Sequence, residues 1–494
     1  MWPAMRRTVL PACATALIVM PSVLAFFSGG FFDKPRIIAA LVSWVLVVPV
    51  ALLSKRPLPV STPGRVALAG LALLCAWTAL SLLWAPIAGR AQDDLQRLLL
   101  YLGAFTAAVA LLSQPGMRRA LEPGLAAGAF IVIAYGLSER LLPGVIDLDQ
   151  SSTSAGRLEQ PLTYWNAYGI LAAVGFILAV RVTGDPTRHR ALRSVVAAAG
   201  VVLGLGVYLS FARGALAAVA VGLLVLAALA PESRPQLRAI VTIGLAAAAA
   251  SLVASTMTTV TSLEQRDAGQ GLVMFGVLLL AAAVAALMAP REPRRALPAP
   301  SLPWSRPATV AGAALLVLVV AGLVVAAFEG KPEGASPVAG ADPARLGSID
   351  TNRYRYWEVA ARSFADRPLE GLGSGGFQVE WLAIEDRVDA SGDAHSLYLE
   401  TAAELGVVGL AFLLMFLTGV ATALVRLYRL DRAAAAGVAA GLAAWAFHAG
   451  LDWDWEMPAV TLPALLLAAA AIGWSEEEAV KPGRAALVGA PATP

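Results

Sequence analysis

Residues 271–289 read GLVMFGVLLLAAAVAALMA, a run without a single charged side chain. A helix of about 20 apolar residues crosses the roughly 30 Å hydrocarbon core of a bilayer. Similar runs recur along the whole chain and are separated by short breaks that carry Arg, Pro and Gly. The sequence therefore predicts an all-α polytopic membrane protein.

The composition supports the same fold class. Of the 494 residues, 58% are hydrophobic and 14% are charged, whereas about 25% are charged in a typical soluble protein. So much apolar surface excludes a soluble enzyme. The net charge of +3 is spread over many loops, so we expect no nucleic-acid partner. Both cysteines, Cys13 and Cys75, lie in apolar runs, where neither a disulfide nor structural zinc is expected.

Hydropathy windows of about 19 residues predict about 12 to 14 spans. The apolar run from Thr8 to Phe26 could be a secretory signal, but no small-residue cleavage site follows it and a second span begins near Arg36. We therefore interpret it as a retained first span. The predicted spans are 8–27, 37–53, 66–84, 97–112, 124–141, 164–180, 194–210, 214–230, 239–256, 271–289, 308–328, 404–425, 433–450 and 457–473.

The distribution of Lys and Arg predicts the orientation in the membrane. Most basic residues fall on one side, which the positive-inside rule assigns to the cytoplasm. Both termini are then cytoplasmic, and the chain divides into 1–328, an exported cap at 329–403, spans at 404–475 and a tail at 476–494. The positive-inside rule does not explain the basic residues on the outer side. These residues become candidates for function: Lys34, Arg36, Arg90, Arg97, Arg140, Arg157, Arg213 and Arg266.

The segment 329–403 is far longer than an ordinary connection and carries helical signals of its own. Asp350 or Thr351 can cap a helix, and a second helix begins near Asp393 and continues past Gly406 into the next span. This segment is predicted to be a folded cap. The apolar stripe expected on its first helix comprises Tyr354, Trp357, Ala361 and Phe364.

Residues 371–376 read GLGSGG, which matches the G-x-G-x-x-G pattern of dinucleotide-binding proteins. That pattern indicates a nucleotide site when it follows a strand within a βαβ unit. No such unit surrounds it here, so a tight turn at the outer membrane face is the better interpretation.

His395 is one of only three histidines, with His189 and His448. It is placed at the start of a helix at the membrane boundary. Imidazole has a reference pKa of about 6.5 and can take a proton from a sugar or phenol hydroxyl near neutral pH. The alternative is an idle interfacial side chain. The spacing gives His395 no Ser, Cys or Asp partner, and three scattered histidines do not form a metal site.

Four arginines are candidates for binding phosphate or pyrophosphate. Arg213 lies between two apolar runs, Arg353 and Arg355 lie at the start of the cap helix, and Arg157 precedes a Tyr-Trp-Asn sequence. A guanidinium group can grip phosphate through two parallel hydrogen bonds. Each could instead be a side chain that extends to the membrane surface, so only convergence on one cavity would make them a site.

Three acidic residues and two tryptophans share another outer boundary, at Asp452, Asp454 and Glu456. Tryptophan belts are ordinary at such boundaries. A metal site is the weaker interpretation, and a role in orienting an acceptor or in supporting the site is the stronger one.

Several motifs together resemble the O-antigen ligase and polymerase superfamily, over most of the chain. In that family a long outer loop carries an Arg four residues before a Trp, followed by a His-Asn/Ser-x-Tyr/Phe-Leu motif. The matching segments are Arg157–Asn166, Ser210–Ala215, Arg353–Trp357, Pro368–Gly373, His395–Leu399, Glu404–Gly406 and Asp452–Trp455.

The resemblance implies a metal-independent, cofactor-free glycosyltransferase of the GT-C type at the outer face of a bacterial cytoplasmic membrane. Its donor would be an undecaprenyl-pyrophosphate-linked glycan. Arg213 and Arg353 would grip the pyrophosphate, with Arg355 and Arg157 as further donor-binding candidates. His395 would activate or position the acceptor hydroxyl for an inverting displacement. Residues that could contact the acceptor or support the site are Tyr398, Glu400, Asp452 and Asp454.

The sequence leaves the acceptor open among a glycan, a lipid and a protein hydroxyl, and thus leaves ligase and polymerase activities open. The Ala- and Arg-rich composition suggests a high-G+C organism, which puts a lipopolysaccharide acceptor in doubt. A transporter for the same lipid-linked sugar is a rival, but transporters place charges near the bilayer midplane and usually show internal repeats. A scaffold without chemistry is a third reading, in which Arg213, Arg353 and His395 would not converge.

Overall fold

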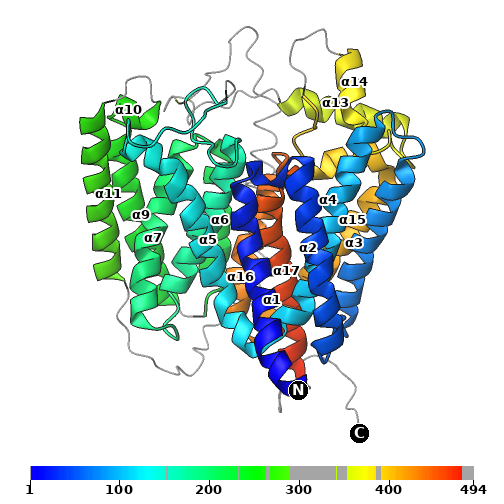
Figure 1. Cartoon of the computed structure of the whole chain (residues 1–494), viewed down its shortest axis with the longest axis horizontal. Helices are drawn as coiled ribbons and strands as arrows, with labels where there is room; N and C mark the ends of the chain where they lie inside the picture. Colours follow the sequence, from blue (N-terminus) through cyan, green and yellow to red (C-terminus); the bar gives the residue numbers. More distant parts are fainter. Residues whose placement is uncertain are drawn as a thin grey trace. The chain divides into compact units, whose positions relative to one another are not determined.

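A computed structural model shows a multi-pass helical protein (Figure 1). The structure describes residues 2–151, 154–231, 233–262, 267–289, 341, 353–384 and 391–480. Within these ranges the regular elements are all helices and no strand occurs. The predicted fold class is therefore confirmed.

Eleven of the described helices are long and apolar enough to cross a membrane, and each coincides with a predicted span. The predicted spans at 214–230 and 433–450 correspond to the shorter helices α8 (Arg213–Leu229) and α16 (Arg432–Ala449). The span predicted at 308–328 lies outside the described residues, as do the proposed caps Asp350 and Thr351 and the basic residue Arg266.

The chain packs as two compact units. Unit 1 comprises 1–124, 355–438 and 445–494, and unit 2 comprises 125–354 and 439–444. These units are defined by which residues pack together, whereas the predicted ranges were defined by their side of the membrane. The predicted ranges therefore stay a prediction. The helices that begin in unit 1 are α1 (Trp2–Ala25), η1 (Ser28–Gly30), α2 (Asp33–Leu53), α3 (Thr62–Ser81), α4 (Ala88–Leu112), α5 (Pro115–Leu141), α14 (Phe377–Ile384), α15 (Leu397–Leu430), α16 (Arg432–Ala449), η3 (Asp454–Glu456) and α17 (Pro458–Val480).

Helix α17 is the centre of unit 1. It packs against α1, α4 and α15, and its apolar segment is completely buried (Figure 1). The neighbouring pair α3 and α15 approach closely through glycines, because a Cβ at Gly70 would lie 2.5 Å from the backbone nitrogen of Phe416. A Cβ at Gly419 would lie equally close to the backbone nitrogen of Ala67. Small residues that admit such close backbone contact are a common device for pairing helices in membranes.

Unit 2 is built around α6 (Trp165–Thr183), whose apolar segment is also completely buried. Helix α6 packs against α7 (Arg190–Leu209), α8 and α9 (Ser233–Ala254). Helix α11 (Ala268–Met288) in turn packs against α7 and α9, after the short helix α10 (Thr258–Thr261). The apolar surface that α11 and α9 leave exposed is consistent with contact to lipid.

The cap contains α13 (Arg353–Asp366) and α14, joined by the glycine-rich turn. The predicted helix in this segment is confirmed. Of its predicted apolar stripe, Trp357 is buried, Tyr354 and Phe364 are half-buried and Ala361 is exposed. The buried face comprises Tyr356, Trp357, Val359, Ala360 and Ser363. Tyr356 contacts the rings of Trp381 and His395 in the cap itself, a contact that spacing alone does not reveal.

Helix α15 begins at Leu397 and is kinked at Gly406, which has φ 63° and ψ −166°. The kink leaves backbone carbonyls of α15 available to the glycine-rich turn. Leu372 N–H donates to Ala403 O at 3.0 Å, and Gly373 N–H donates to Glu404 O at 2.8 Å. Backbone hydrogen bonding at the kink therefore fixes the cap to the start of α15.

Replacing Gly406 with Ala should destabilise unit 1 strongly. A left-handed backbone costs a residue with a Cβ roughly 1–3 kcal/mol, and a Cβ at Gly406 would lie 2.1 Å from the carbonyl oxygen of Leu369. Thermal unfolding of the detergent-purified protein should show a clearly lowered midpoint. Gly89→Ala is the matched control, since a Cβ at Gly89 in α4 meets nothing within 4 Å. Equal midpoints for the two variants would contradict this account of the kink.

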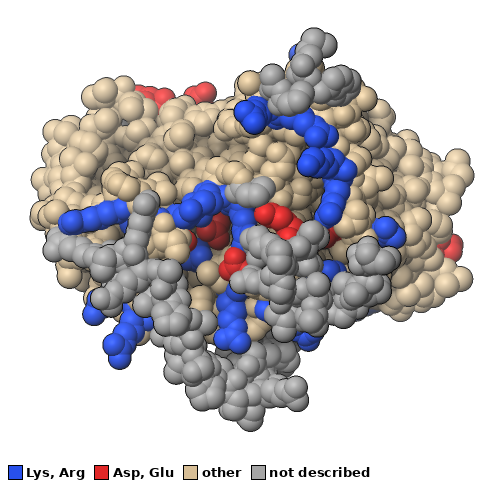
Figure 2. Space-filling view, turned by 90° about the horizontal axis from the view of Figure 1, so that it is seen from below, with Lys and Arg blue, Asp and Glu red and all other residues tan. Residues whose placement is uncertain are grey.

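Figure 2 shows the face seen from below in Figure 1, and Lys and Arg are spread across it and not gathered into one block. The assignment of membrane sides stays a prediction. A reporter that is active only in the cytoplasm should be inactive when inserted between residues 335 and 345. The same reporter fused after residue 494 should be active. Activity at the internal position would reverse the predicted orientation.

Candidate functional site

His395 is held in a defined orientation at the start of α15. Its φ of 52° lies in the left-handed region, which residues other than glycine adopt at a cost. Its Nδ1 lies 3.0 Å from the carbonyl oxygen of Asp393. A carbonyl only accepts hydrogen bonds, so in the neutral ring Nδ1 carries the proton and Nε2 is the acceptor. This is the tautomer that a general base acting through Nε2 requires.

Aromatic rings fix the plane of the half-buried imidazole. The ring of Tyr356 stacks on it, with centroids 5.0 Å apart and planes 22° apart. The ring of Trp453 meets it edge-on at 6.3 Å. Both contacts are within unit 1, and together they restrict rotation of the ring without using its nitrogen atoms.

Two predicted support residues hold the segment that carries His395. Glu400 Oε2 accepts a hydrogen bond from Ala394 N–H at 2.8 Å, directly before the histidine. Tyr398 donates its hydroxyl proton to Ala446 O at 2.8 Å, which attaches α15 to α16. These contacts fit the support role that the sequence suggests for both.

The other two histidines make contacts of a different kind. His189 caps α7, where its ring accepts a hydrogen bond from Ala191 N–H. His448 is completely buried and pairs with Asp454 at 2.7 Å. Both contacts stabilise the fold locally.

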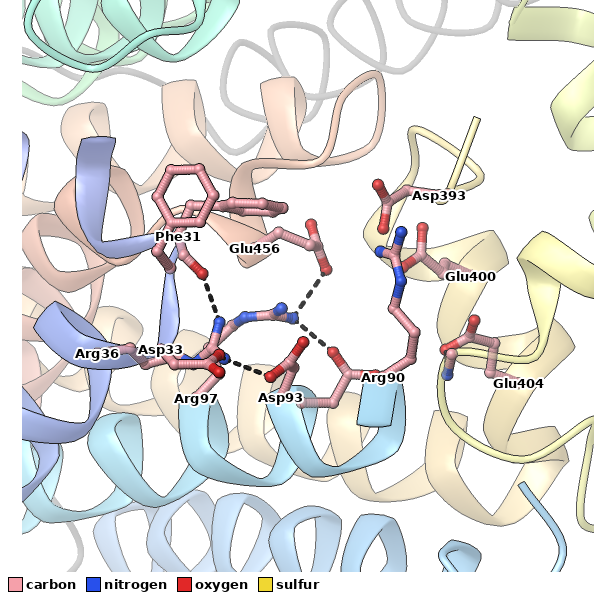
Figure 3. A pocket seen from close by; sticks show the side chains of 14 residues that line it. Phe31, Asp33, Arg36, Arg90, Asp93, Arg97, Asp393, Glu400, Glu404 and Glu456 are labelled. Carbon is pink, nitrogen blue, oxygen red and sulfur yellow. Dashed lines mark hydrogen bonds and ion pairs between the residues drawn. The ribbon is translucent and has the colours of Figure 1, made fainter. Parts of the chain in front are cut away.

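A polar pocket lies within unit 1 (Figure 3), and its lining includes Asp393, two residues before His395. It is located at the ends of α2, α4 and α15, and is closed by the segment 392–393 and by η3. The pocket residues are Phe31, Phe32, Asp33, Arg36, Arg90, Asp93, Asp94, Arg97, Gly375, Gly392, Asp393, Glu400, Glu404 and Glu456.

Two of the three arginines that line the pocket form ion pairs with neighbouring carboxylates. Arg36 pairs with Asp33 and Asp93, both at 2.6 Å. Arg97 pairs with Asp94 at 2.9 Å and with Glu456 at 3.3 Å. The side chains of Arg36 and Arg97 are almost fully buried, and paired carboxylates are what such buried guanidinium groups require.

Arg90 differs from these two. Within the part of the chain that the structure describes, it makes no hydrogen bond and no ion pair, although its charge acts on Asp393. Figure 3 shows its guanidinium extending toward Asp393 and Glu400. Arg90 is therefore the pocket arginine whose donors can serve a ligand.

Burial raises the pKa of two carboxyl groups that line the pocket from loop segments. Burial raises the pKa of Glu456 to about 8; Arg97 opposes the rise, while Asp393 and Asp94 add to it. Desolvation likewise raises the pKa of Asp393, against the charges of His395, Arg90 and Arg97. Glu456 therefore takes up a proton as the pH falls through about 8, which reduces the negative charge of the pocket.

The glycine-rich turn 371–376 is confirmed as a tight turn, with positive φ at Gly371, Gly373 and Gly375. Its amide groups bind a carboxylate of the protein itself. Glu404 accepts hydrogen bonds from Gly375 N–H at 2.9 Å and from Phe377 N–H at 3.0 Å. The amides that could have cradled a phosphate are thus occupied, and a nucleotide site at this turn is not supported.

The four predicted donor-binding arginines are distributed between the two units. Arg157, Arg213 and Arg353 belong to unit 2, and Arg355 belongs to unit 1 with His395. Arg157 is buried, its guanidinium lies 3.4 Å from the ring centroid of Trp165, and its Nε donates to Ser154 O at 2.7 Å. Arg213 is the first residue of α8, and Arg353 is the first residue of α13. Their convergence with His395 stays a prediction.

The predicted acidic cluster is divided among different partners. Asp452 is fully buried and its Oδ1 accepts a hydrogen bond from Trp453 N–H at 3.0 Å, while Asp454 pairs with His448. Glu456 lines the pocket. Among the described residues, no three His, Cys, Asp or Glu side chains are grouped as metal ligands. These contacts fit the support role suggested for Asp452 and Asp454.

Sequence reasoning found only part of this pocket. The excess of basic residues on the outer side pointed to Arg36, Arg90 and Arg97, but the carboxylates of α2 and α4 were not selected. A usable signal was present, because Asp33, Asp93 and Asp94 stand in or near the first turns of apolar helices, where a charge is costly without a partner.

Comparison with known protein families gives a match over part of the chain. Residues 271–414 match the family model described as O-Antigen ligase, a segment that contains the cap, His395 and the carboxylates of α15 but does not reach Arg157 or Arg213. Comparison with curated proteins gives no match. The family match confirms the resemblance, predicted from the motifs, to the O-antigen ligase and polymerase superfamily.

Proposed function

We propose that this membrane protein is a glycosyltransferase that moves a glycan from an undecaprenyl-pyrophosphate donor to an acceptor hydroxyl, in the manner of an O-antigen ligase. The observation that carries the proposal is the tautomer of His395. A histidine within the matched family segment has Nδ1 bound to a carbonyl, so its Nε2 can accept a proton from the acceptor.

The proposed reaction is a single displacement with inversion. The acceptor oxygen gives its proton to His395 Nε2 and attacks the anomeric carbon, while the bond from that carbon to the pyrophosphate oxygen breaks. Negative charge accumulates on the departing pyrophosphate. Arg213 and Arg353, with Arg355 and Arg157 as further candidates, would stabilise that charge, because fixed guanidinium groups in a partly dry site favour the charged transition state.

Neither a metal nor a cofactor has a role in the proposed step. The reaction site is assigned to the outer face of a bacterial cytoplasmic membrane, as the Lys and Arg distribution predicts. Within the superfamily, a ligase and a polymerase differ in whether the acceptor is another molecule or a second lipid-linked glycan.

A reconstituted assay tests the proposal. Purified protein in liposomes is incubated with a lipid-pyrophosphate glycan and with candidate acceptors, and transfer of the glycan is followed with and without a chelator. Transfer that is unaffected by chelation and gives the inverted anomer would support the proposal. Movement of the intact lipid-linked glycan across the bilayer, with no new glycosidic bond, would identify a transporter instead.

A further inference from the structure

We infer that Glu404 is a positioning residue for the proposed base His395, which it orients through helix α14 and a row of aromatic rings. The inference rests on the proposed function, because it takes His395 as the base. It goes further by identifying a residue that sets the orientation of the imidazole without touching the reacting atoms. Every residue of this connection belongs to unit 1.

Glu404 binds the amide groups at which helix α14 begins. Its side chain is buried among the residues that line the pocket (Figure 3). Oε2 accepts the N–H of Gly375 at 2.9 Å, and Oε1 accepts the N–H of Phe377, the first residue of α14, at 3.0 Å. The first amide groups of a helix have no partner within that helix. Glu404 therefore supplies a partner from α15 and fixes where α14 starts relative to α15.

Three aromatic rings, here called the aromatic row, lead from the start of α14 to His395. The ring of Phe377 stacks on the ring of Trp381, with centroids 6.4 Å apart and planes 13° apart. Trp381 meets the ring of Tyr356 on α13 edge-on at 4.6 Å. Tyr356 in turn stacks on the imidazole at 5.0 Å. The residue whose amide group Glu404 binds is therefore also the first member of the aromatic row.

Burial of the aromatic row allows it to transmit the position of α14. Phe377 is 0% exposed, Trp381 is 2% exposed and Tyr356 is 6% exposed. Interiors packed at this density contain little free space and transmit strain from one side chain to the next. A shift of α14 would therefore move Trp381 and then Tyr356, and the ring of Tyr356 would lose its stacked position on the imidazole.

Other contacts hold the earlier part of the glycine-rich turn. Leu372 and Gly373 donate their amide protons to backbone carbonyls of α15, and the Ser374 hydroxyl donates to Asp94 of α4. These contacts do not use the side chain of Glu404, and they end before α14 begins. Loss of the Glu404 carboxylate should thus release the start of α14 while the turn itself stays attached.

The orientation of the imidazole is tested by NMR on the protein in nanodiscs, without donor or acceptor. The chain has three histidines, so isotope-labelled histidine gives three ring signals, and His395→Gln identifies the relevant one. In the wild type we expect a nuclear Overhauser contact between the ring protons of His395 and Tyr356. Glu404→Gln should lose this contact, because one carboxyl oxygen becomes an NH₂ group that cannot accept an amide proton.

Three further variants test the same connection. Trp381→Leu leaves the hydrogen bonds of Glu404 in place but interrupts the aromatic row, so the contact should again be lost, even if Glu404→Gln fails to fold. Glu404→Asp keeps both carboxyl oxygens on a shorter side chain and should retain part of the contact. Glu358→Gln is the matched control, since Glu358 is exposed on α13 and pairs there with Arg362. It should leave the contact unchanged.

Kinetics in the reconstituted transfer assay provide a second measurement. Glu404→Gln should lower kcat by up to about 10²-fold, the loss that misplacement by about 1 Å can cause. The acceptor KM should change less than kcat, because the variant misplaces the base and removes no contact with the acceptor. Adding Trp381→Leu to Glu404→Gln should lower kcat no further than the more damaging single change, since changes along one connection are not additive.

The outcomes separate this inference from the proposed function. An intact contact between His395 and Tyr356 in folded Glu404→Gln or in Trp381→Leu would overturn the inference. Its absence from the wild type, its loss in Glu358→Gln, or additive losses of kcat in the double variant would do the same. Loss of the contact in Glu404→Gln of a protein that transfers no glycan would retain the orientation of the imidazole by Glu404 and remove the proposed function.

Discussion

Replacing His395 with Ala is expected to lower glycan transfer roughly 10²- to 10⁴-fold, the loss associated with a general base. Donor binding should remain near the wild-type level, because the proposal assigns it to the arginines and the lipid tail. The measurement is single-turnover transfer in liposomes.

His189→Ala is the matched control, since His189 caps α7 in unit 2 and has no part in the proposed step. Its effect on transfer should be small. Tyr356→Leu should separate positioning from chemistry, because loss of the stacked ring should lower transfer by less than His395→Ala does. Unaltered turnover in His395→Ala would show that His395 is not the base. It would leave the conclusion about the membrane fold unchanged.

Arg213→Ala and Arg353→Ala should each lower transfer roughly 10²- to 10³-fold, as for other fixed donors that stabilise a developing negative charge. Arg213→Lys and Arg353→Lys should restore only part of the activity, because a single ammonium lacks the planar fork that binds two phosphate oxygens. The measurement combines transfer rates with binding of a lipid-pyrophosphate, which should weaken in all four variants.

Arg65→Lys, on the exposed surface of α3, provides the control for a charge-conserving change and should leave transfer intact. Insertion and folding of every variant would be checked by thermal unfolding. Wild-type activity in both Arg213→Lys and Arg353→Lys would rule out their assignment to the pyrophosphate. A defect in Arg353→Lys alone would indicate that Arg353 of the cap helix binds the pyrophosphate and that Arg213 of α8 does not.

The positions of the eleven apolar helices among the described residues could be predicted from the sequence, because hydrocarbon imposes a fixed length and a fixed polarity on every crossing helix. The turn 371–376 could be predicted as well, because a left-handed turn needs glycine. The role of His395 stays a prediction, which rests on its position at a helix start.

What only the tertiary structure decided is how distant segments meet. The carboxylates of α2, α4 and α15 form one pocket although more than 300 residues separate Asp94 from Glu400. The tautomer of His395 follows from the carbonyl of Asp393, and the buried face of α13 follows from the ring of Tyr356 against it. Hydropathy places each helix across the membrane independently of the others, whereas ion pairs and ring contacts depend on which helices become neighbours, and the pattern along one helix does not contain that information.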